Sequence, residues 1–559
     1  MELLYIWIQD FRNLKNIGFN FSPHIKFEFR NHSNELIIEP HLAKRKGFFG
    51  RKITNVTAII GKNGTGKSNL LDLICYLTKG SAKQFHKFII IYEHNRTGND
   101  PQYVCKTNIE GLVYDPRLNI VETGKSIPNI GTIFFSNVND GREHRFARDV
   151  IDISQNSTSR HIRKRSDVFN QLRFLLSEGF ERFELSAPNS VLLTTRSDLS
   201  LKKPLQIYLA NNTKFDALIK RYSSGIKRHE PAEQFRYLMR YTLFIYSLNH
   251  VFSLFLDNSE IGVSGTENTF MSAFNEIFQN RFPEPDLPNI SSVHERLELV
   301  LRDMMNKFDQ LGDMKAADLN MFLDFDRRIA DLNLTVAEEK ISKKTYFKAF
   351  FDRHNQNIFR GHSAIFDFPE IIDIEWAGMS SGHKAFLNIF AQLHSTLKRV
   401  EKQEHVLICI DEGDLYLHPE WQRQFLNRIL SFVPEMLNKK LQFVLTTHSP
   451  FLISDLPKEN LILLKSGNTG DCEIATDQIK LRQTFGANIY DLFRGPFVLD
   501  QSTISEFALV KINRAIAILT QPAISRVDFN EARDIVSAVG DYAVHFKLDL
   551  MLSNAQTRL

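Results

Sequence analysis

The sequence contains little of what marks membrane, secreted or zinc-scaffold proteins. Its four cysteines, Cys75, Cys105, Cys409 and Cys472, lie far apart without a CxxC pair, so neither a disulfide framework nor a zinc site is indicated. No run approaches the roughly 18 to 20 apolar residues of a membrane span, and the first residues are strand-like rather than signal-like. We therefore expect a cytoplasmic protein with no membrane segment, whose cysteines are buried as small hydrophobic residues.

A strong net charge and a sustained heptad repeat are also missing. The formal net charge of +4 is too small by itself to indicate nucleic-acid binding. Local basic runs could still contact phosphates, although solvated surface is the more common explanation for such runs. These runs are Lys44-Arg45-Lys46 with Arg51-Lys52, Arg160 with Arg163-Lys164-Arg165, and Lys220-Arg221 with Lys227-Arg228. Long coiled-coil arms are not expected.

The length of 559 residues predicts at least two domains. The apolar pattern predicts an α/β lobe at 1–150, a mainly helical insertion at 151–365, a second α/β lobe at 366–500 and a helical tail at 501–559. The expected strands are Leu3–Gln9, Val56–Ile60, Ile371–Trp376, Val406–Ile410 and Phe443–Thr447. The expected helices are Asn69–Leu77, Phe235–Leu256, His294–Leu311, one from His383, Ser505–Leu519 and Phe529–Val536.

A glycine-rich loop between the second strand and the first helix matches GxxxxGK[ST] in full. In such a loop the backbone N–H groups hold phosphates, the lysine adds a positive charge and the last hydroxyl binds Mg²⁺. The nucleotide-binding residues are therefore predicted to be Gly61, Asn63, Gly64, Gly66, Lys67 and Ser68. The predicted ligand is ATP with Mg²⁺.

Two acidic residues, Asp411 and Glu412, follow the apolar strand Val406–Ile410. An aliphatic strand that delivers two carboxylates to its carboxyl end is a Walker B pattern. We predict that Asp411 holds Mg²⁺ together with Ser68, and that Glu412 polarises the attacking water.

The segment Met379-Ser380-Ser381-Gly382-His383 precedes a predicted amphipathic helix. By itself, a Ser/Gly turn that caps a helix is the more common explanation. Its position shortly before Walker B, however, resembles the ABC ATPase superfamily, whose LSGGQ signature stands there. That resemblance implies that Ser380 and Gly382 contact the γ-phosphate bound by a second copy, in a head-to-tail dimer.

Two further segments resemble ABC ATPase motifs, because they follow one another along the chain in the same order as those motifs do. Leu415-Tyr416-Leu417-His418-Pro419 follows Walker B at the D-loop position, and Thr446-Thr447-His448-Ser449 follows a strand, as the switch histidine does. The resemblance implies that His448 senses the γ-phosphate, whereas His418 is expected to be structural. A Q-loop glutamine is not found, and the nearest stretch is Phe134-Phe135-Ser136-Asn137.

The sequence is similar to the RecF-like ABC ATPases of prokaryotic antiphage defence, and in particular to the PtuA type of Septu and Septu-carrying retrons. This narrower resemblance rests on the Phe11-Arg12-Asn13 turn, the Ser-Ser-Gly signature, Asp411 to Pro419, Thr446 to Pro450, and Thr484 to Tyr490. It implies an α/β ABC-type ATPase head with a large helical insertion between Walker A and the signature.

The same resemblance implies a regulatory ATPase that controls a separate HNH nuclease of PtuB type. No Toprim or HNH-like motif is evident, so nuclease chemistry is not expected in this chain. In a retron setting, a reverse transcriptase with its RNA-linked DNA is a further possible partner. The alternative is a DNA-repair or chromosome-maintenance ATPase that acts directly on DNA.

Overall fold

A computed structural model describes most of the chain, and its residues fall into two compact units. The described residues are 1–40, 47–79, 85–94, 102–123, 130–138, 146, 149–154, 160–181, 187–195, 203–258, 263–283, 290–307, 331–336, 346–361, 372–437, 439–479, 481–494 and 504–557. The first unit comprises residues 1–58 and 68–447, and the second comprises 59–67 and 448–559.

The first unit begins with a five-stranded sheet in the order β2-β1-β6-β7-β9 and a three-stranded sheet in the order β3-β4-β8. Their aromatic and aliphatic side chains share one core, in which the ring centroids of Trp7 and Phe29 lie 4.6 Å apart. The bounds are β1 (Glu2–Phe11), β2 (Leu14–Asn20), β3 (Ile25–Arg30), β4 (Glu35–Pro40), β6 (Phe88–His94), β7 (Gln102–Thr107), β8 (Val113–Tyr114) and β9 (Ile120–Glu122).

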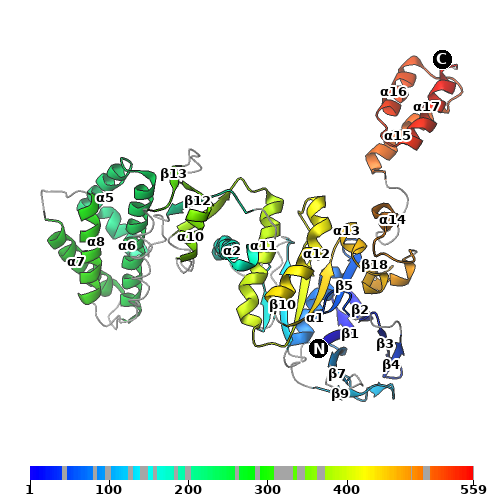
Figure 1. Ribbon diagram of the computed structural model, residues 1–559, viewed down its shortest axis with the longest axis horizontal. Helices are drawn as coiled ribbons and strands as arrows, with labels where there is room; N and C mark the ends of the chain where they lie inside the picture. The colour runs from blue at the N-terminus through cyan, green and yellow to red at the C-terminus, as the bar shows by residue number, and fades with distance from the viewer. Residues whose placement is uncertain are drawn as a thin grey trace. The chain divides into compact units, whose positions relative to one another are not determined.

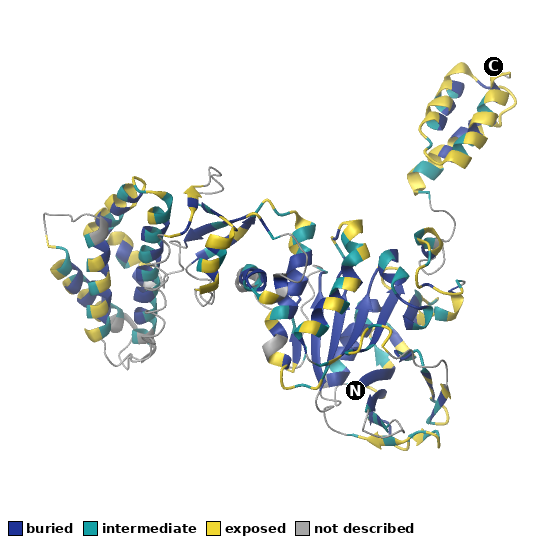
Figure 2. Cartoon of the chain, in the orientation of Figure 1, coloured by how far each residue is buried: buried dark blue, intermediate teal, exposed yellow. Residues whose placement is uncertain are grey.

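A central sheet carries the predicted Walker B strand, with strands in the order β11-β10-β16-β17-β5. Strands β11, β10, β16 and β17 are parallel to one another, and β10, β16 and β17 are buried along almost their whole length (Figure 2). Parallel strands buried on both faces require continuous apolar runs, which explains sequences such as Val406–Ile410. The bounds are β5 (Ile53–Gly61), β10 (Ile130–Ser136), β11 (Val150–Asp152), β16 (His405–Asp411) and β17 (Lys440–Thr446).

Three helices of the first unit follow or precede the motifs. Helix α1 (Lys67–Lys79) follows the glycine-rich loop, α11 (Ser381–Thr396) follows the signature segment, and α12 (Pro419–Met436) follows Walker B. The side chain of His418 caps α12, because its Nδ1 accepts a hydrogen bond from the Glu420 N–H at 3.3 Å.

The region expected to be a helical insertion contains a helical bundle and part of a small sheet. Helices α5 to α8 lie side by side in Figure 1 around an apolar core that includes Phe215, Phe252 and Phe274. Asn212 begins α5 by accepting a hydrogen bond from the Phe215 N–H at 3.1 Å. The helices are α2 (Arg160–Leu175), α3 (Glu178–Glu181), α4 (Lys203–Asn211), α5 (Thr213–Ile226), α6 (Pro231–Asn258), α7 (Val263–Arg281), α8 (Ile290–Lys307) and α10 (Arg353–Gly361).

One strand predicted to continue the α/β sheet has different neighbours. Strand β15 (Ile372–Ala377) pairs antiparallel with β12 (Ser190–Thr195), within a four-stranded sheet ordered β13-β14-β12-β15. The other strands are β13 (Leu334–Val336) and β14 (Phe347–Phe350). The alternation of buried Ile372, Ile374 and Trp376 correctly predicts a strand, but alternation does not specify the strand with which it pairs.

The second unit combines residues 59–67 with the chain from residue 448 onward. It contains the antiparallel pair of β18 (Leu461–Ser466) and β19 (Cys472–Ile474). Two short helices, α13 (Pro450–Ser454) and α14 (Ile489–Arg494), also belong to this unit. The predicted helical tail is present as α15 (Glu506–Leu519), α16 (Arg526–Ser537) and α17 (Tyr542–Gln556), which pack around a core of their own. Ser525 and Asp541 cap the last two helices.

All four cysteines are buried, as predicted. None of the helices in the described ranges is long and apolar enough to cross a membrane.

The side chain of Gln442 joins the first strand to the central sheet. Its Oε1 accepts a hydrogen bond from the Leu3 N–H at 2.7 Å, and its Nε2 donates to the Leu3 carbonyl at 2.9 Å. Both residues are buried, and the pairing of β1 with β6 shifts register between Leu3 and Tyr5. One amide therefore satisfies both backbone groups of Leu3 at an irregular position.

We predict that Gln442→Leu lowers the melting temperature of the full chain. The substitution keeps the approximate volume but leaves two buried backbone groups without this partner, at a cost of about 1–3 kcal/mol each. Differential scanning calorimetry would measure the effect, with Gln279→Leu as the control, because Gln279 is exposed on α7. An equal response of both variants would contradict this role of Gln442.

Candidate nucleotide-binding and hydrolysis site

The carboxylate of Asp411 lies at the end of β16 and accepts hydrogen bonds from three hydroxyl groups. Ser68 Oγ and Thr446 Oγ1 donate to Oδ1 at 3.0 and 2.6 Å, and Ser136 Oγ donates to Oδ2 at 3.3 Å. Asp411 is 3% exposed. The donors come from α1, β17 and β10, and the two strands flank β16 in the sheet. Because parallel strands end at the same edge of a sheet, their last residues meet there.

Burial raises the pKa of Asp411 above its ordinary value, because desolvation disfavours the charged carboxylate. The hydrogen bonds from Thr446 and Ser68 oppose this effect, while the nearby Glu412 and Asp72 carboxylates add to it. A divalent cation beside Asp411 would favour the ionised form.

The oxygen atoms of Ser68 and Asp411 fit the preference of Mg²⁺ for hard ligands. In the described ranges, no group of three or more His, Cys, Asp and Glu side chains is placed to hold a metal ion. A carboxylate and a hydroxyl suit Mg²⁺, which usually takes its other ligands from water and phosphate oxygens.

Glu412 begins a tight turn after β16. It has φ of +47°, in the left-handed region that is unfavourable for side chains with a Cβ, and its N–H donates to Thr446 Oγ1 at 2.9 Å. Gly413 follows in a crowded position, where a Cβ atom would lie 2.5 Å from Ile410 Cγ2 and 2.7 Å from Phe425 Cζ. Sterics therefore constrain the backbone directly after Glu412.

The same turn is also linked, through Asp414, to the residue that directly follows β17. The buried Asp414 carboxylate accepts a hydrogen bond from Thr447 Oγ1 at 2.6 Å. The segment 411–414 is thus held at the Asp411 carboxylate, the Glu412 N–H and the Asp414 carboxylate. Sequence reasoning noted the neighbouring motifs but did not predict that Ser136, Thr446 and Thr447 are hydrogen-bond donors in this cluster.

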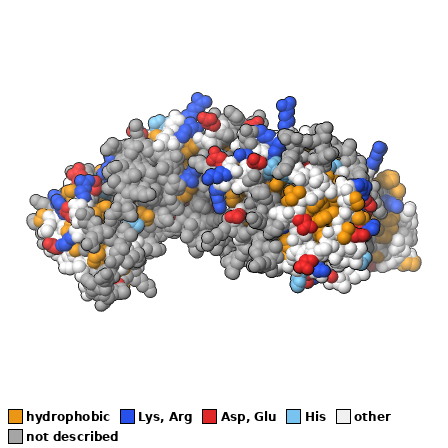
Figure 3. All heavy atoms as spheres, turned by 90° about the horizontal axis from the view of Figure 1, so that it is seen from below, with side chains coloured by type: hydrophobic (Ala, Val, Ile, Leu, Met, Phe, Trp, Pro, Cys, Tyr) orange, Lys and Arg blue, Asp and Glu red, His pale blue; other side chains and the backbone are white. Residues whose placement is uncertain are grey.

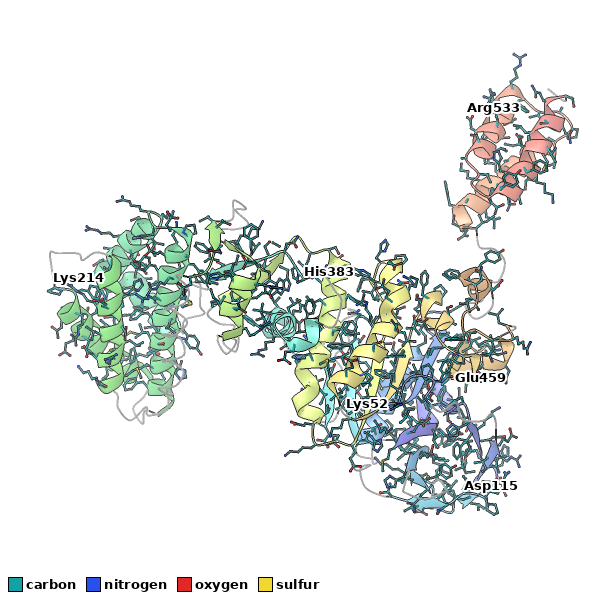
Figure 4. The ribbon with its side chains drawn as sticks, viewed as in Figure 1. Lys52, Asp115, Lys214, His383, Glu459 and Arg533 are labelled. Carbon is teal, nitrogen blue, oxygen red and sulfur yellow. The ribbon has the colours of Figure 1, made fainter. Side chains whose placement is uncertain are left out.

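The signature segment begins α11, and Ser380 caps this helix. Its Oγ accepts a hydrogen bond from the His383 N–H at 3.2 Å, while the residue itself is exposed; Figure 4 labels His383 at the start of the helix. A Cβ atom at Gly382 would approach the Tyr416 carbonyl oxygen to 3.0 Å. The capping explanation of Ser380 therefore holds, and the glycine brings the signature close to the turn that follows Glu412.

A buried amide network joins α11 to α2, the first described helix of the insertion. Trp376 Nε1 donates to Gln171 Oε1 at 2.7 Å, and Gln171 Nε2 donates to Asn388 Oδ1 at 3.1 Å. The network borders a cavity of about 530 Å³, whose lining also includes Asn137 and Tyr416. The insertion is thus packed directly on the signature helix.

The turn between β1 and β2 is fixed to α1. Arg12, with φ of +55°, donates to Asn69 Oδ1 at 2.8 Å and to the buried Asp72 carboxylate at 2.6 Å. Asn69 Nδ2 in turn donates to Asn13 Oδ1 at 2.7 Å. The Phe11-Arg12-Asn13 turn therefore holds the beginning of the helix that carries Ser68.

In the second unit, the glycine-rich loop curls around the ammonium group of Lys67. Its Nζ donates to the carbonyl oxygens of Gly61 and Lys62 at 3.1 and 3.2 Å. Gly61, Gly64 and Gly66 have positive φ angles, and a Cβ at Gly61 would lie 2.4 Å from the Leu464 carbonyl oxygen. Asn63 and Gly64 at the loop tip are exposed. The loop thus has the curled backbone that phosphate binding requires.

His448 is the first residue of the second unit after β17, and it is exposed. The predicted basic runs are described only in part. Lys44 to Lys46 and the side chains from Arg160 to Ser166 lie outside the described residues, and Lys220 forms an ion pair with Asp216 at 2.6 Å. On the face shown in Figure 3, described Lys and Arg side chains are interspersed with Asp and Glu.

A family model described as "AAA ATPase domain" matches residues 1–453. This match covers most of the chain, so the protein belongs to the AAA ATPase domain family. The α/β ABC-type fold predicted from the motifs is confirmed.

Curated proteins similar to this chain include two probable ATPases of retrons and one Septu protein. The chain is 33% identical over 95 residues to the Retron Ec83 probable ATPase of Escherichia coli, covering 16% of this chain and 17% of that protein. It is 26% identical over 193 residues to the Septu protein PtuA of Bacillus thuringiensis, covering 32% and 42%. It is 22% identical over 206 residues to the Retron Vc95 probable ATPase of Vibrio cholerae serotype O1 biovar El Tor, covering 35% and 38%.

These matches confirm the predicted resemblance to Septu and retron ATPases. The chain spans less than half the length of each of these relatives. A solved SMC head bound to the C-winged helix domain of ScpA aligns over 85% of this chain with 12% identity and a TM-score of 0.24, too low to establish a shared fold.

We predict that Gly413→Ala lowers the melting temperature of the chain. The added Cβ would overlap Ile410 and Phe425, and overpacking of this kind costs about 1–3 kcal/mol. Gly540→Ala is the matched control, because a Cβ there meets nothing within 4 Å. Thermal unfolding of both variants tests the assignment, and an unchanged melting temperature for Gly413→Ala would show that the turn is not sterically constrained.

Proposed function

We propose that this protein hydrolyses ATP with Mg²⁺ and uses the nucleotide cycle to control a separate effector. The observation that carries the proposal is the 3.0 Å hydrogen bond between Ser68, which ends the glycine-rich motif, and the buried carboxylate of Asp411. A hydroxyl directly after the phosphate-binding lysine and a Walker B carboxylate are the pair that holds Mg²⁺ in P-loop NTPases. Bound Mg²⁺ neutralises charge on the phosphate oxygens.

In the proposed reaction, Glu412 polarises a water molecule whose oxygen attacks the γ-phosphorus, and the bond from that phosphorus to the ADP oxygen breaks. Gly61, Asn63, Gly64 and Gly66 form the phosphate loop, and Lys67 contributes its positive charge. His448 contacts the γ-phosphate. The partial exposure of Glu412 supports this role, because a water molecule has to reach its carboxylate.

Each proposed ATP site is completed by Ser380 and Gly382 of a second copy. The exposure of Ser380 at the start of α11 supports this arrangement, since a signature that acts on another copy has to lie at the surface. The N–H groups at the beginning of a helix are suited to bind a phosphate. Two copies arranged head to tail would then form two equivalent sites.

Mixing two inactive variants tests this arrangement. Lys67→Ala and Ser380→Arg are each expected to lose ATP hydrolysis, but a mixed dimer would contain one site without either substitution. If subunits assort randomly and each site works independently, an equal mixture should regain about one quarter of wild-type activity. A phosphate-release assay measures the recovery.

The control mixture is Lys67→Ala with Glu412→Gln. Both substitutions affect residues contributed by the same copy to a site, so every site in this mixture stays defective. Recovery in the control, or no recovery in the first mixture, would contradict the proposed pair of independent composite sites.

The proposed effector is an HNH nuclease of PtuB type on another chain, and a retron reverse transcriptase with its RNA-linked DNA would be a further partner. Similarity to proteins named for Septu and retron systems supports this proposal. ATP binding would close the dimer and hydrolysis would reopen it, so the two nucleotide states present different surfaces to the effector.

Purification of the tagged protein from its native operon tests the partner proposal. We expect an HNH nuclease to copurify and its DNA cleavage with ATP to differ between wild type and Glu412→Gln, because the variant should bind ATP without turnover. Mass spectrometry and a cleavage assay provide the measurements. A chain that purifies alone and binds DNA ends with ATP would instead support direct action on DNA.

A further inference from the structure

Asn137 lies beside the turn that carries Glu412 because of the register between two strands. In the parallel pair of β10 and β16, Ser136 is the partner of Asp411, so Asn137 is the first residue past the paired positions. Its N–H donates to the Asp411 carbonyl oxygen at 3.2 Å. Asn137 is 2% exposed.

The side-chain amide of Asn137 points its donor group at the backbone of this turn. Nδ2 donates to the Gly413 carbonyl oxygen at 3.1 Å and lies 3.5 Å from that of Leu415. Its Oδ1 is buried and has no hydrogen-bond partner among the described residues. The contact with the turn therefore depends on the donor of the amide, not on its acceptor.

The turn needs such a contact because two of its residues have unfavourable backbone angles. Glu412 and Tyr416 have φ of +47° and +68°, although neither is glycine. Thr446, the last residue of β17, accepts the Glu412 N–H, and Thr447, the next residue, donates to Asp414. Asn137 directly follows β10, which lies on the other side of β16. The turn is thus held from both neighbouring strands.

We propose that Asn137 is a positioning residue for ATP hydrolysis. It fixes the turn so that the Glu412 carboxylate is placed to polarise the attacking water. This inference rests on the proposed function, because it assigns Asn137 an effect on catalysis by Glu412. Asn137 itself makes no contact with the nucleotide in this proposal. Small displacements of a catalytic group can reduce the rate strongly while binding is unchanged.

Two substitutions separate hydrogen bonding from packing. Asn137→Ala removes the amide, whereas Asn137→Asp keeps the shape but places a carboxylate oxygen against the Gly413 carbonyl. A role in packing alone predicts that Asp preserves activity better than Ala. A role as hydrogen-bond donor predicts that Asp is no better than Ala.

The experiment measures kcat and KM for ATP hydrolysis by the full chain, and equilibrium binding of a nonhydrolysable ATP analogue. We expect both variants to lower kcat by about tenfold or more, with KM and analogue binding changed by less than about twofold. Hydrogen exchange at 412–417 should become faster in both variants.

Asn55→Ala and Asn55→Asp are the matched controls. Asn55 is also buried, and its Nδ2 donates to a backbone carbonyl, that of Phe21, at 2.6 Å. The controls should retain kcat, since Asn55 lies at the start of β5 and not at the turn. An equal loss of kcat in the controls would show general destabilisation and overturn the inference.

Unchanged kcat in the Asn137 variants, or activity of Asn137→Asp close to wild type, would also overturn it while leaving the proposed ATPase function intact. A wild-type protein that does not hydrolyse ATP would refute the proposed function and, with it, the role assigned to Asn137.

Discussion

The buried carboxylate of Asp411 is the constraint on which the arrangement of the first unit depends. A carboxylate that is 3% exposed is costly unless donors replace the water it has lost. Three hydroxyl groups do so, and they belong to Ser68, Ser136 and Thr446 on three different elements. The strand order β10-β16-β17 is what brings two of them to the same sheet edge, and α1 brings the third. The hydrogen bonds to this one carboxylate therefore fix the ends of β10 and β17 and the beginning of α1 relative to one another.

The turn after Asp411 extends this constraint toward the signature. Left-handed angles at Glu412 and Tyr416 direct the chain sharply, and only a residue without a Cβ fits between Ile410 and Phe425 at position 413. The Tyr416 carbonyl then lies where a side chain at Gly382 would crowd it. Movement of the signature segment and movement of the turn are consequently coupled by direct contact. Glycine at 382 permits this contact with the turn, and glycine at 413 lets the turn itself fit between Ile410 and Phe425.

The motifs could be found from sequence because each is local. A glycine-rich loop before a helix and an aliphatic strand that ends in two acids are contained in a few consecutive residues, and the family they indicate is confirmed. The partners of Asp411 were not predictable in the same way. Ser136 and Thr446 lie 275 and 35 residues from it, and only the strand order and the register Ser136 to Asp411 bring them together. Strand β15 illustrates the same limit, since its alternation predicted a strand but not its pairing with β12. The roles of the site residues in ATP binding and hydrolysis stay predictions.

The contact between the insertion and the signature helix is made of directional bonds rather than apolar packing alone. Gln171 accepts from Trp376 and donates to Asn388, so its amide links α2 to both β15 and α11. A slide of α2 along α11 by one helical turn would leave these buried amides without their partners, at a cost of about 1–3 kcal/mol for each group. Apolar side chains would tolerate such a slide far better, because their contacts are not directional. The amide network thus favours movement of α2 and α11 as one body. If α2 is displaced, α11 would then move with it, and so would Ser380 at the start of α11.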